Sequence, residues 1–450
     1  MEKRALLIAG VAFFGAAGMV AAADDQVTTW NALGAQAAVM AGQTVASSRT
    51  LAIEQIAVHD ALNAIDPRYQ RYVFQASALP GASADAAVAA AAHDALVGAI
   101  ATGITVPGFG TLAGQAAAVA LLHAKYSEAL AAIPDGPAKT DGVAIGSSAA
   151  AAILALRSID YAATLVGYTP GTRPGDWRPT PNPVPADPPA PADRLPALLP
   201  GWGGLTPFVL PGADQFEPKG PPRLSGPRYA RDYNEVMEVG EQFSAIRTPD
   251  QTSMARFWYE GSAIGWSRIA RVVSDAQALD SWQRARLLAL IDMAMADGFI
   301  AGFRAKYDFH FWRPVSAIRA GDTDDNDDTV AGFSWNSLLN TPAMPDYPST
   351  HSVLGGSAAE VLRRFFGDDD IAFTTTSGAP FGGLTRSFNS FSDAARENGE
   401  SRIYAGIHFR SAVEDGIEQG RKIGGYVFTH ALRPLNQTDD DKTDREPRDR

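Results

Sequence analysis

Three groups of residues in the carboxyl-terminal half of the chain could together bind a tetrahedral oxyanion. Lys306 and Arg313 lie seven residues apart in the aromatic run KYDFHFWRP. If this run is helical, seven residues turn the helix by roughly 700°, so both cations project from nearly the same face until Pro314 ends the helix. Two cations among aromatic side chains are costly to bury unless an anion neutralises them. The alternative is that they pair with local carboxylates such as Asp308.

The second group is Pro348-Ser349-Thr350-His351, which is typical of a turn that leads into a helix. A helix N-terminus presents free backbone N–H groups and the positive end of the helix dipole, so it binds anions readily. Ser349 adds a hydroxyl donor, and His351 can transfer a proton near neutral pH. Taken alone, the same pattern is also that of an ordinary helix cap.

The third group is Arg402 followed by His408, with Gly406 between them. The planar guanidinium of arginine suits two oxygens of one oxyanion. A histidine ring nitrogen can bind a metal or attack phosphorus. The alternative is a surface arginine and a packed histidine on one helix.

In this order, Lys-x6-Arg-Pro, Pro-Ser-x-His and Ser-Arg-x5-His resemble the motifs of one superfamily, that of type 2 phosphatidic acid phosphatases and vanadium-dependent haloperoxidases. The segment from Leu51 to Asp66 looks like the amino-terminal part of bacterial haloperoxidase-like proteins, as does the stretch from Gly201 to Phe208. The resemblance covers most of residues 27–430. Small membrane phosphatases of the superfamily lack such a large upstream region, which favours the haloperoxidase branch.

The resemblance implies two kinds of role. The groups that hold vanadate would be three cations, a hydroxyl and a backbone N–H, from Lys306, Arg313, Arg402, Ser349 and Thr350. His408 would be the axial ligand of vanadium, and His351 would be the acid–base residue near the opposite axial oxygen. With vanadate as cofactor, the implied reaction oxidises a halide with hydrogen peroxide to hypohalous acid, and the chain can associate as a homodimer.

The same residues suit phosphoryl transfer. His408 would then attack phosphorus to form a phosphohistidine, and His351 would protonate the leaving group of a phosphate monoester. That alternative is an exported acid phosphatase without a cofactor. A second alternative is a non-catalytic member that only binds an oxyanion, and it would tolerate loss of His351.

The chain departs from the family's pattern at three positions. Thr350 replaces the usual glycine and would be strained if the loop needs a positive φ. Ala412 stands where the family often has an aspartate that orients the last histidine, and on a continuous helix Asp415 would be about 10 Å away. Met344 stands where haloperoxidases often have an aromatic residue or histidine.

Three further features lie outside these motifs. His310 is predicted to lie beside the site or to pack in the core. Glu260 is either a counter-ion for one of the arginines or a solvated glutamate. The acidic run Asp322–Asp328 begins like a calcium loop, but Asp327 and Phe333 occupy the positions of its glycine and glutamate, so an exposed acidic loop is expected.

Composition limits the class of protein. The chain has 450 residues, 46% of them hydrophobic, and a net charge of −12, which argues against nucleic acid as the main partner. It has no cysteine, so disulfides and thiolate metal sites are excluded. Residues 1–23 have the pattern of a secretory signal peptide, which predicts a periplasmic or secreted protein, and the alternative for this apolar run is a membrane anchor. We expect no membrane span after residue 23.

The predicted fold is all-α, built from helical bundles. Alanine-rich sequence over residues 24–168 predicts a first bundle. Residues 169–227 are rich in proline and glycine but hold spaced aromatic and aliphatic residues, so we expect a long connection packed on the surface. Residues 228–435 form the second bundle with the three motifs, including a helix from about Gln283 to Trp312 and one β-like run near Phe373–Thr376. The charged residues 436–450 are predicted to be a disordered tail.

Overall fold

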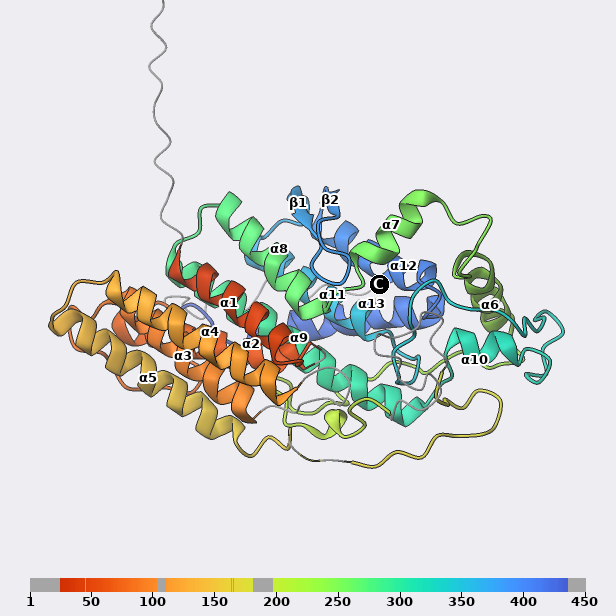
Figure 1. Cartoon of the computed structure of the whole chain (residues 1–450), viewed down its shortest axis with the longest axis horizontal. Coiled ribbons are helices and arrows are strands. Elements are labelled where there is room, and N and C mark those ends of the chain that lie inside the picture. Colours follow the sequence, from red (N-terminus) through yellow and green to blue (C-terminus); the bar gives the residue numbers. More distant parts are fainter. Residues whose placement is uncertain are drawn as a thin grey trace, which may run out of the picture.

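The computed structural model describes residues 25–44, 46–102, 111–162, 164, 166–180 and 197–435. These residues form thirteen α-helices, one short 3-10 helix and a two-stranded hairpin, which confirms the all-α prediction. The described part is elongated, with the first five helices at one end and α6 (Pro227–Val239) and α10 (Pro314–Arg319) at the other (Figure 1). The predicted signal peptide, residues 1–23, and the predicted tail, residues 436–450, lie outside the described residues.

The amino-terminal end consists of α1 (Gln26–Met40), α2 (Ser47–Ile65), α3 (Ala84–Thr102), α4 (Leu112–Ala131) and α5 (Pro137–Arg157). Alanine favours these helices intrinsically. Side-chain caps start α1 and α4, since the Asp25 carboxylate accepts from the backbone of Val27 and the Thr111 hydroxyl accepts from the backbone of Gly114. Small residues let α3 and α5 approach closely, because a Cβ added at Gly146 would lie 2.3 Å from the carbonyl oxygen of Ala87.

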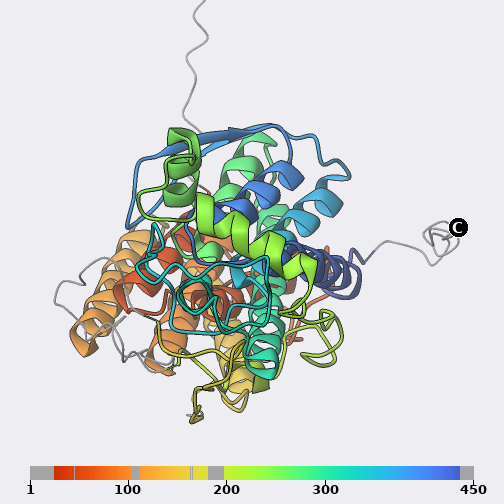
Figure 2. The ribbon, with the colours of Figure 1, turned by 90° about the vertical axis from the view of Figure 1, so that its right-hand side faces the viewer.

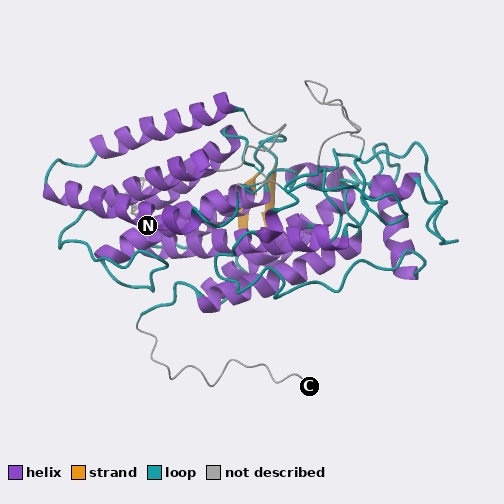
Figure 3. Cartoon of the chain, turned by 90° about the horizontal axis from the view of Figure 1, so that it is seen from below, coloured by secondary structure: helices purple, strands orange, loops and turns teal. Residues whose placement is uncertain are grey.

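The rest of the described structure contains α6, α10 and six further helices: α7 (Pro249–Phe257), α8 (Ser262–Ala276), α9 (Ser281–Phe309), α11 (Thr350–Phe366), α12 (Phe391–Tyr404) and α13 (Arg410–His430). The predicted β-like run is confirmed as β1 (Phe373–Thr376). It pairs antiparallel with β2 (Thr385–Phe388), and Phe373 faces Phe388 across the hairpin. Figure 3 shows this hairpin as the strand element of an otherwise helical structure.

The long helix α9 holds the two ends of the molecule together. It packs against α2 on one side and against α11 and α13 on the other. One apolar core follows it, from Trp30 on α1 to Val427 on α13. Figure 2 shows the amino-terminal helices, in orange, at the lower left and the carboxyl-terminal helices, in blue, at the upper right.

Helix α11 is fixed by close packing on α13. A Cβ added at Gly420 would lie 2.0 Å from the carbonyl oxygen of Val353, and one at Gly356 would lie 2.4 Å from that of Ile417. The two backbones therefore touch where side chains would hold them apart. This contact positions the amino-terminal end of α11, where the second sequence motif lies.

The proline-rich connection packs on the surface as expected, over its described residues 169–180 and 197–227. Trp177, Trp202 and Phe208 are buried. Asp297 on α9 accepts from the backbone N–H groups of Phe208, Val209 and Leu210, at 2.5, 2.8 and 2.9 Å. Since a buried carboxylate is satisfied by several N–H donors, this residue fixes the connection to the central helix.

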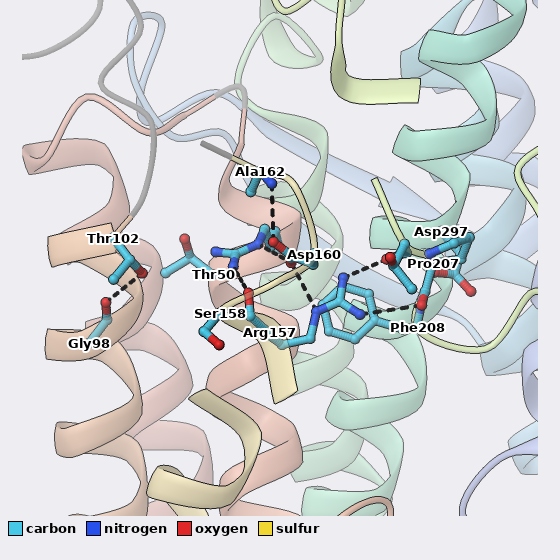
Figure 4. A network of polar contacts seen from close by, with 12 residues as sticks. Thr50, Gly98, Thr102, Arg157, Ser158, Asp160, Ala162, Pro207, Phe208 and Asp297 are labelled. Atoms are coloured by element: carbon cyan, nitrogen blue, oxygen red, sulfur yellow. Dashed lines mark hydrogen bonds and ion pairs between the residues drawn. The ribbon is translucent and has the colours of Figure 1, made fainter. Parts of the chain in front are cut away.

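A second contact ties the same stretch to the amino-terminal helices. The Arg157 guanidinium donates to Asp160 at 3.0 Å and to the carbonyl oxygens of Thr206 and Pro207 at 2.6 and 3.3 Å (Figure 4). It also lies 3.9 Å above the ring of Phe208. Charge-assisted hydrogen bonds from Arg157 thus hold the proline-rich connection against α5.

Helix α3 corrects one expectation from the sequence. By length and composition it could cross a membrane, although no segment after residue 23 was read as a span. It is a packed element of the structure, since 67% of its apolar window is buried, against α2, α4 and α5. Core helices of this kind satisfy the same test of length and hydropathy.

Helix α9 ends earlier than predicted, at Phe309 instead of Trp312. His310 adopts a left-handed conformation with φ of 37°, which stops the helix. The next residues pair with the proline-rich connection, since the N–H of Trp312 donates to the carbonyl oxygen of Gly175 at 2.8 Å. Pro314 therefore begins α10, where a proline is favoured, and does not end α9.

The acidic run is mostly exposed, but one of its residues is not. Asp324 is buried and accepts from the Thr329 hydroxyl at 2.9 Å through both carboxylate oxygens. Its backbone neighbour Asn326 donates to it at 3.1 Å. Asp324 thus closes the loop on itself.

Candidate oxyanion site

The structure brings the three sequence motifs together around His408. Lys306 comes from α9, Arg313 from the segment before α10, and Arg402 from α12, and burial is complete or nearly so for all three. These cations lower the pKa of His408 further, after burial itself, which is the largest cause. The prediction that both cations project from one helix is wrong, because Arg313 lies beyond the end of α9, but both still face His408.

Lys306 is bound by the loop that precedes α11. Its ammonium group donates to the carbonyl oxygens of Pro345, Asp346 and Pro348 at 2.9, 2.9 and 2.6 Å. A lysine has three N–H donors, and all three are used here. Its contribution to an anion site is therefore its charge and its hold on this loop. Burial, followed by Arg313, lowers its pKa well below the ordinary value.

Arg313 contacts the histidine directly. Its NH1 lies 2.9 Å from His408 Nε2 and donates to the carbonyl oxygen of Ile407 at 2.7 Å. Its Nε donates to the carbonyl oxygen of Met344 at 2.7 Å. Burial lowers the pKa of Arg313 to about 10, so this guanidinium stays charged at neutral pH. His408 itself does not lie on a helix, because α13 begins only at Arg410.

Asp346 is the site residue that sequence reasoning missed. Its Oδ1 lies 2.9 Å from His408 Nδ1, and the residue is fully buried. Burial raises its pKa to about 7, against the opposing effect of Arg313 and Lys306. The signal in the sequence was a carboxylate between two prolines, just ahead of Ser349. Asp415, the carboxylate considered earlier, instead accepts from the Tyr347 hydroxyl at 2.8 Å.

The second motif forms a helix N-terminus as predicted. Ser349 is the N-cap of α11, and its hydroxyl oxygen accepts from the Ser352 hydroxyl at 2.9 Å. Thr350 is the first helical residue and does not have a positive φ, so the strain considered for this position is absent. The N–H of Ser349 donates to the carbonyl oxygen of Ala412 at 2.8 Å, which ties the cap to α13.

His351 lies on the first turn of α11 and reaches Glu260. Its Nε2 lies 3.0 Å from the Glu260 carbonyl oxygen, which can only accept. Nε2 therefore carries the proton, and Nδ1 is the basic nitrogen of the neutral ring. Burial, then Arg402, lowers the pKa of His351 well below its ordinary value, so the ring is neutral at neutral pH.

The Glu260 side chain is not solvated, which excludes one of the two alternatives that the sequence left open. It is 5% exposed, pairs with Arg268 and accepts from the N–H of Gly378 at 2.9 Å. Its partner is therefore an arginine outside the three motifs. Glu260 contacts His351 through its carbonyl oxygen. Its carboxylate links Gly378, just after β1, to Arg268 on α8.

Arg402 retains unused donor capacity. Its NH1 donates to the carbonyl oxygen of Trp258 at 3.0 Å, and its guanidinium lies 5.5 Å from the ring centroid of Tyr259. Burial lowers its pKa to about 10. Among the residues that the structure describes, its buried Nε has no hydrogen-bond partner, and neither has the hydroxyl of Thr350.

His310 does not belong to this group. It is exposed, and its Nδ1 lies 2.9 Å from the carbonyl oxygen of Tyr307 at the end of α9. The left-handed turn at His310 directs the side chain away from the core. The expectation that it neighbours the site or packs in the core is therefore wrong.

The charges and donors fit a small oxyanion such as vanadate. Three buried cations face a single carboxylate, Asp346, within the described part of the chain. An excess of buried positive charge is unfavourable without an anion. The unpartnered Arg402 Nε and the start of α11 supply donors for one. His408 supplies an unprotonated ring nitrogen.

Fold and cluster together define a helical-bundle protein with a buried cationic site. Residues 286–437 match the family model described as the second helical-bundle domain of VCPO. Vanadium chloroperoxidase from Curvularia inaequalis is 26% identical over 338 residues, which cover 59% of this chain and 55% of that protein. The chain thus spans about half the length of this curated relative.

Solved structures extend the similarity to nearly the whole fold. A bacterial vanadium-dependent iodoperoxidase is 25% identical, with a TM-score of 0.74 over 92% of this chain and 97% of that one. The apo form of a bacterial vanadium-dependent chloroperoxidase is 17% identical, with a TM-score of 0.66 over 87% of this chain and 94% of that one, which shows the shared fold. Residues 286–437 thus match a domain of vanadium chloroperoxidases, and the chain is similar to vanadium haloperoxidases in sequence and fold.

Proposed function

We propose that the protein is a vanadate-dependent haloperoxidase that oxidises a halide with hydrogen peroxide to hypohalous acid. The observation that carries this proposal is the neutral His408 at the centre of three buried cations with one carboxylate. This set matches the charge and donor needs of vanadate, and the relatives are named for their vanadium dependence. Bound vanadate would act as a Lewis acid that activates hydrogen peroxide.

The chain's own residues hold the anion and exclude water. The Arg402 guanidinium and the backbone N–H groups at the start of α11 would donate to its oxygens, with Ser349 at the cap. Arg313 and Lys306 add charge in a buried, low-dielectric setting, where fixed donors stabilise negative charge strongly. His408 would offer a ring nitrogen to the bound group, with the Arg313 guanidinium beside it.

His351 is the residue that accepts a proton from hydrogen peroxide. Because its Nε2–H is bound to the Glu260 carbonyl oxygen, Nδ1 is free to take a proton from hydrogen peroxide and later to return it. Its lowered pKa keeps this nitrogen unprotonated near neutral pH. Removal of His351 should therefore slow turnover and leave anion binding intact.

The test is halogenation of a diketone dye with hydrogen peroxide and iodide, bromide or chloride. The mature protein is prepared in phosphate-free buffer, with and without added orthovanadate. We expect activity only with orthovanadate, a loss of about 100-fold or more in His351→Ala, and no activity in His408→Ala.

Two outcomes would replace the proposal. No halogenation from folded wild-type protein at any orthovanadate concentration, together with hydrolysis of a phosphate monoester that depends on His408, would make it an acid phosphatase. Binding of orthovanadate without either activity would make it an oxyanion-binding protein. The same assay thus separates the three functions that the sequence left open.

We also propose that the protein is exported through residues 1–23. The pattern of two basic residues, an apolar run and a small-residue end supports this reading. Amino-terminal sequencing of the protein from the cell exterior should begin at Asp24. Recovery of the full chain from the cytoplasm alone would contradict it.

A further inference from the structure

We propose that the turn of residues 258–260, between α7 and α8, sets Arg402 and His351 relative to each other, with Tyr259 as its positioning residue. The carbonyl oxygens of the first and last residues of this turn accept from Arg402 NH1 and from His351 Nε2, each at 3.0 Å. One short segment thus binds a side chain from α12 and a side chain from α11. The part of the test that uses vanadate rests on the proposed function, whereas the part that reads these contacts does not.

The side chain of Tyr259 adds a second contact to Arg402. The carbon of the buried guanidinium lies 5.5 Å from the centroid of the Tyr259 ring, which is within the range of a cation–π contact. The ring itself is fixed at two places. Its hydroxyl donates to the carbonyl oxygen of Asn340 at 2.7 Å, and its centroid lies 6.0 Å from that of Phe381, which follows β1. Tyr259 therefore offers Arg402 a surface that cannot easily turn away.

The residues on both sides of Tyr259 tie the turn to the helices around it. The indole Nε1 of Trp258 donates to the Glu397 carboxylate on α12 at 3.0 Å. The carboxylate of Glu260 pairs with Arg268 on α8. Both Trp258 and Glu260 are buried. The turn is therefore linked to α12, the helix that carries Arg402, and to α8 at the same time.

A long side chain such as Arg402 needs this support to act as a fixed donor. Arg402 lies in the last turn of α12, which places its backbone but leaves its side-chain torsions free. An anion that had to order them would bind more weakly, because ordering a flexible side chain costs entropy. The turn holds the guanidinium in place beforehand, and its buried Nε still has no partner among the described residues. Since His351 binds the same turn, a shift of the turn would move both residues.

The test compares Tyr259→Leu and Tyr259→Phe with the matched control Tyr72→Leu. The Tyr72 hydroxyl also donates to a carbonyl oxygen at 2.7 Å, that of Phe208 in the proline-rich connection. The first reading is the side-chain N–H resonances of Arg402 and His351 in ¹H–¹⁵N spectra without any anion, identified by their loss in Arg402→Lys and His351→Gln. The second is the Kd for orthovanadate, from ⁵¹V NMR. The third is kcat at saturating orthovanadate, with the halide that the wild type oxidises. Circular dichroism verifies that each variant is folded.

We expect the Arg402 Nε–H resonance of the wild type to be shifted upfield by the Tyr259 ring. In Tyr259→Leu this shift should vanish, and the His351 resonance should move as well. The Kd for orthovanadate should rise about 5- to 30-fold in this variant, the range that cation–π contacts supply, and kcat should fall about 10-fold. Tyr259→Phe keeps the ring and should restore the shift and most of both constants. Tyr72→Leu should leave all three readings unchanged.

A folded Tyr259→Leu with the wild-type resonances, Kd and kcat would overturn the assignment, as would equal losses in Tyr72→Leu. A raised Kd with the wild-type kcat would overturn the link to His351. If Tyr259→Leu does not fold, the wild-type spectrum and Tyr259→Phe decide the question, because a wild type without the upfield shift contradicts the ring contact. Failure of the wild type to bind orthovanadate or to oxidise any halide would count against the proposed function, and the two resonances would still test the role of Tyr259.

Discussion

The Lys306 ammonium group lies 2.6 Å from the carbonyl oxygen of Pro348, the residue directly before the cap of α11. Its other two N–H groups donate to the carbonyl oxygens of Pro345 and Asp346, so all three of its donors bind the backbone of one loop. A lysine in this motif would be expected to contact the anion itself. In this chain it instead fixes the loop that carries Asp346 on one side and Ser349 on the other.

Replacing Lys306 should therefore damage the loop before it damages chemistry. In Lys306→Met, three buried carbonyl oxygens lose their donor, and leaving even one buried acceptor unsatisfied costs about 1–3 kcal/mol. Loss of the buried charge offsets part of this cost. We expect a lower free energy of unfolding by urea denaturation and weaker binding of orthovanadate.

Arg304→Met is the matched control. Arg304 lies two residues away on the same helix, is partly exposed and pairs with Asp308 at 3.3 Å. Surface pairs of this kind contribute little, so we expect a change within about 1 kcal/mol and unchanged anion binding. If both variants unfold alike, the loop does not depend on the Lys306 ammonium group.

Replacing Arg402 should leave the stability of the anion-free protein almost unchanged and should abolish its stabilisation by the anion. Arg402 makes one hydrogen bond to Trp258 and leaves its buried Nε without a partner among the described residues, while it repels Arg313. In anion-free buffer, Arg402→Met should keep the unfolding free energy within about 1 kcal/mol of the wild type. The anion-dependent part of stability should disappear.

The measurement is thermal unfolding with and without orthovanadate. At a ligand concentration of 100 times Kd, the wild type should gain about 2.7 kcal/mol, and Arg402→Met should gain almost nothing. Arg396→Met, an exposed arginine on the same helix, serves as the control and should respond like the wild type. A full orthovanadate shift in Arg402→Met would remove this arginine from the anion site.

Much of the fold and of the site could be predicted because the signals were local. Alanine-rich sequence favours helix wherever it packs, and the start of α11 is fixed by Ser349 as its own cap. The three motifs also contained the cations and the histidines that the structure brings together in one buried cluster. These features depend on residues close together in the chain.

The remaining features depend on contacts between distant segments. Helix α9 stops at Phe309, where His310 is left-handed, and the next residues pair with the proline-rich connection through Trp312 and Gly175. Asp346 lies 2.9 Å from His408, on a loop whose carbonyl oxygens accept from Lys306. Glu260 is buried because Arg268 and Gly378 surround its carboxylate. None of these pairings leaves a pattern at helical or strand spacing.

The close contact between α11 and α13 predicts a sensitive glycine. In Gly420→Ala the new Cβ would meet the backbone of Val353 at 2.0 Å, so the helices must move apart. Overpacking of this kind costs about 1–3 kcal/mol, and the shift would reach Ser349 and His351 on α11. We expect a lower melting temperature and weaker binding of orthovanadate.

Gly425→Ala on the same helix is the control. There the nearest atom to a new Cβ is the far end of the Arg364 side chain, at 3.3 Å, which can move aside. Alanine has the higher helix propensity by up to about 1 kcal/mol, so this variant should be as stable as the wild type or more so. Equal losses in the two variants would mean that helix spacing is not the cause.

The polar group between α1, α2, α8 and α9 should make stability depend on pH. Asp292 on α9 is fully buried and accepts from Ser267 at 2.8 Å and from Asn31 at 3.4 Å. Burial raises its pKa to about 7, although Arg271 opposes this shift. Glu54 on α2 is also buried, and its pKa is raised first by burial and then by Asp292.

The sign of the effect follows from the raised pKa of Asp292. Below its unfolded pKa of about 3.9 both states are protonated, and between there and about 7 only the folded state keeps the proton. This contribution to stability is therefore lost as pH rises toward 7, by up to about 1.4 kcal/mol per pH unit. Asp292→Asn keeps the hydrogen bond from Ser267 and cannot titrate.

We therefore expect the unfolding free energy of Asp292→Asn, measured by urea denaturation at pH 5, 6, 7 and 8, to rise relative to the wild type up to pH 7 and then to level off. Asp275→Asn is the control, since Asp275 is a largely exposed carboxylate on α8 that pairs with Arg284. Its pH profile should run parallel to that of the wild type. A parallel profile for Asp292→Asn would show that the buried carboxyl group stays ionised, with Arg271 compensating its charge.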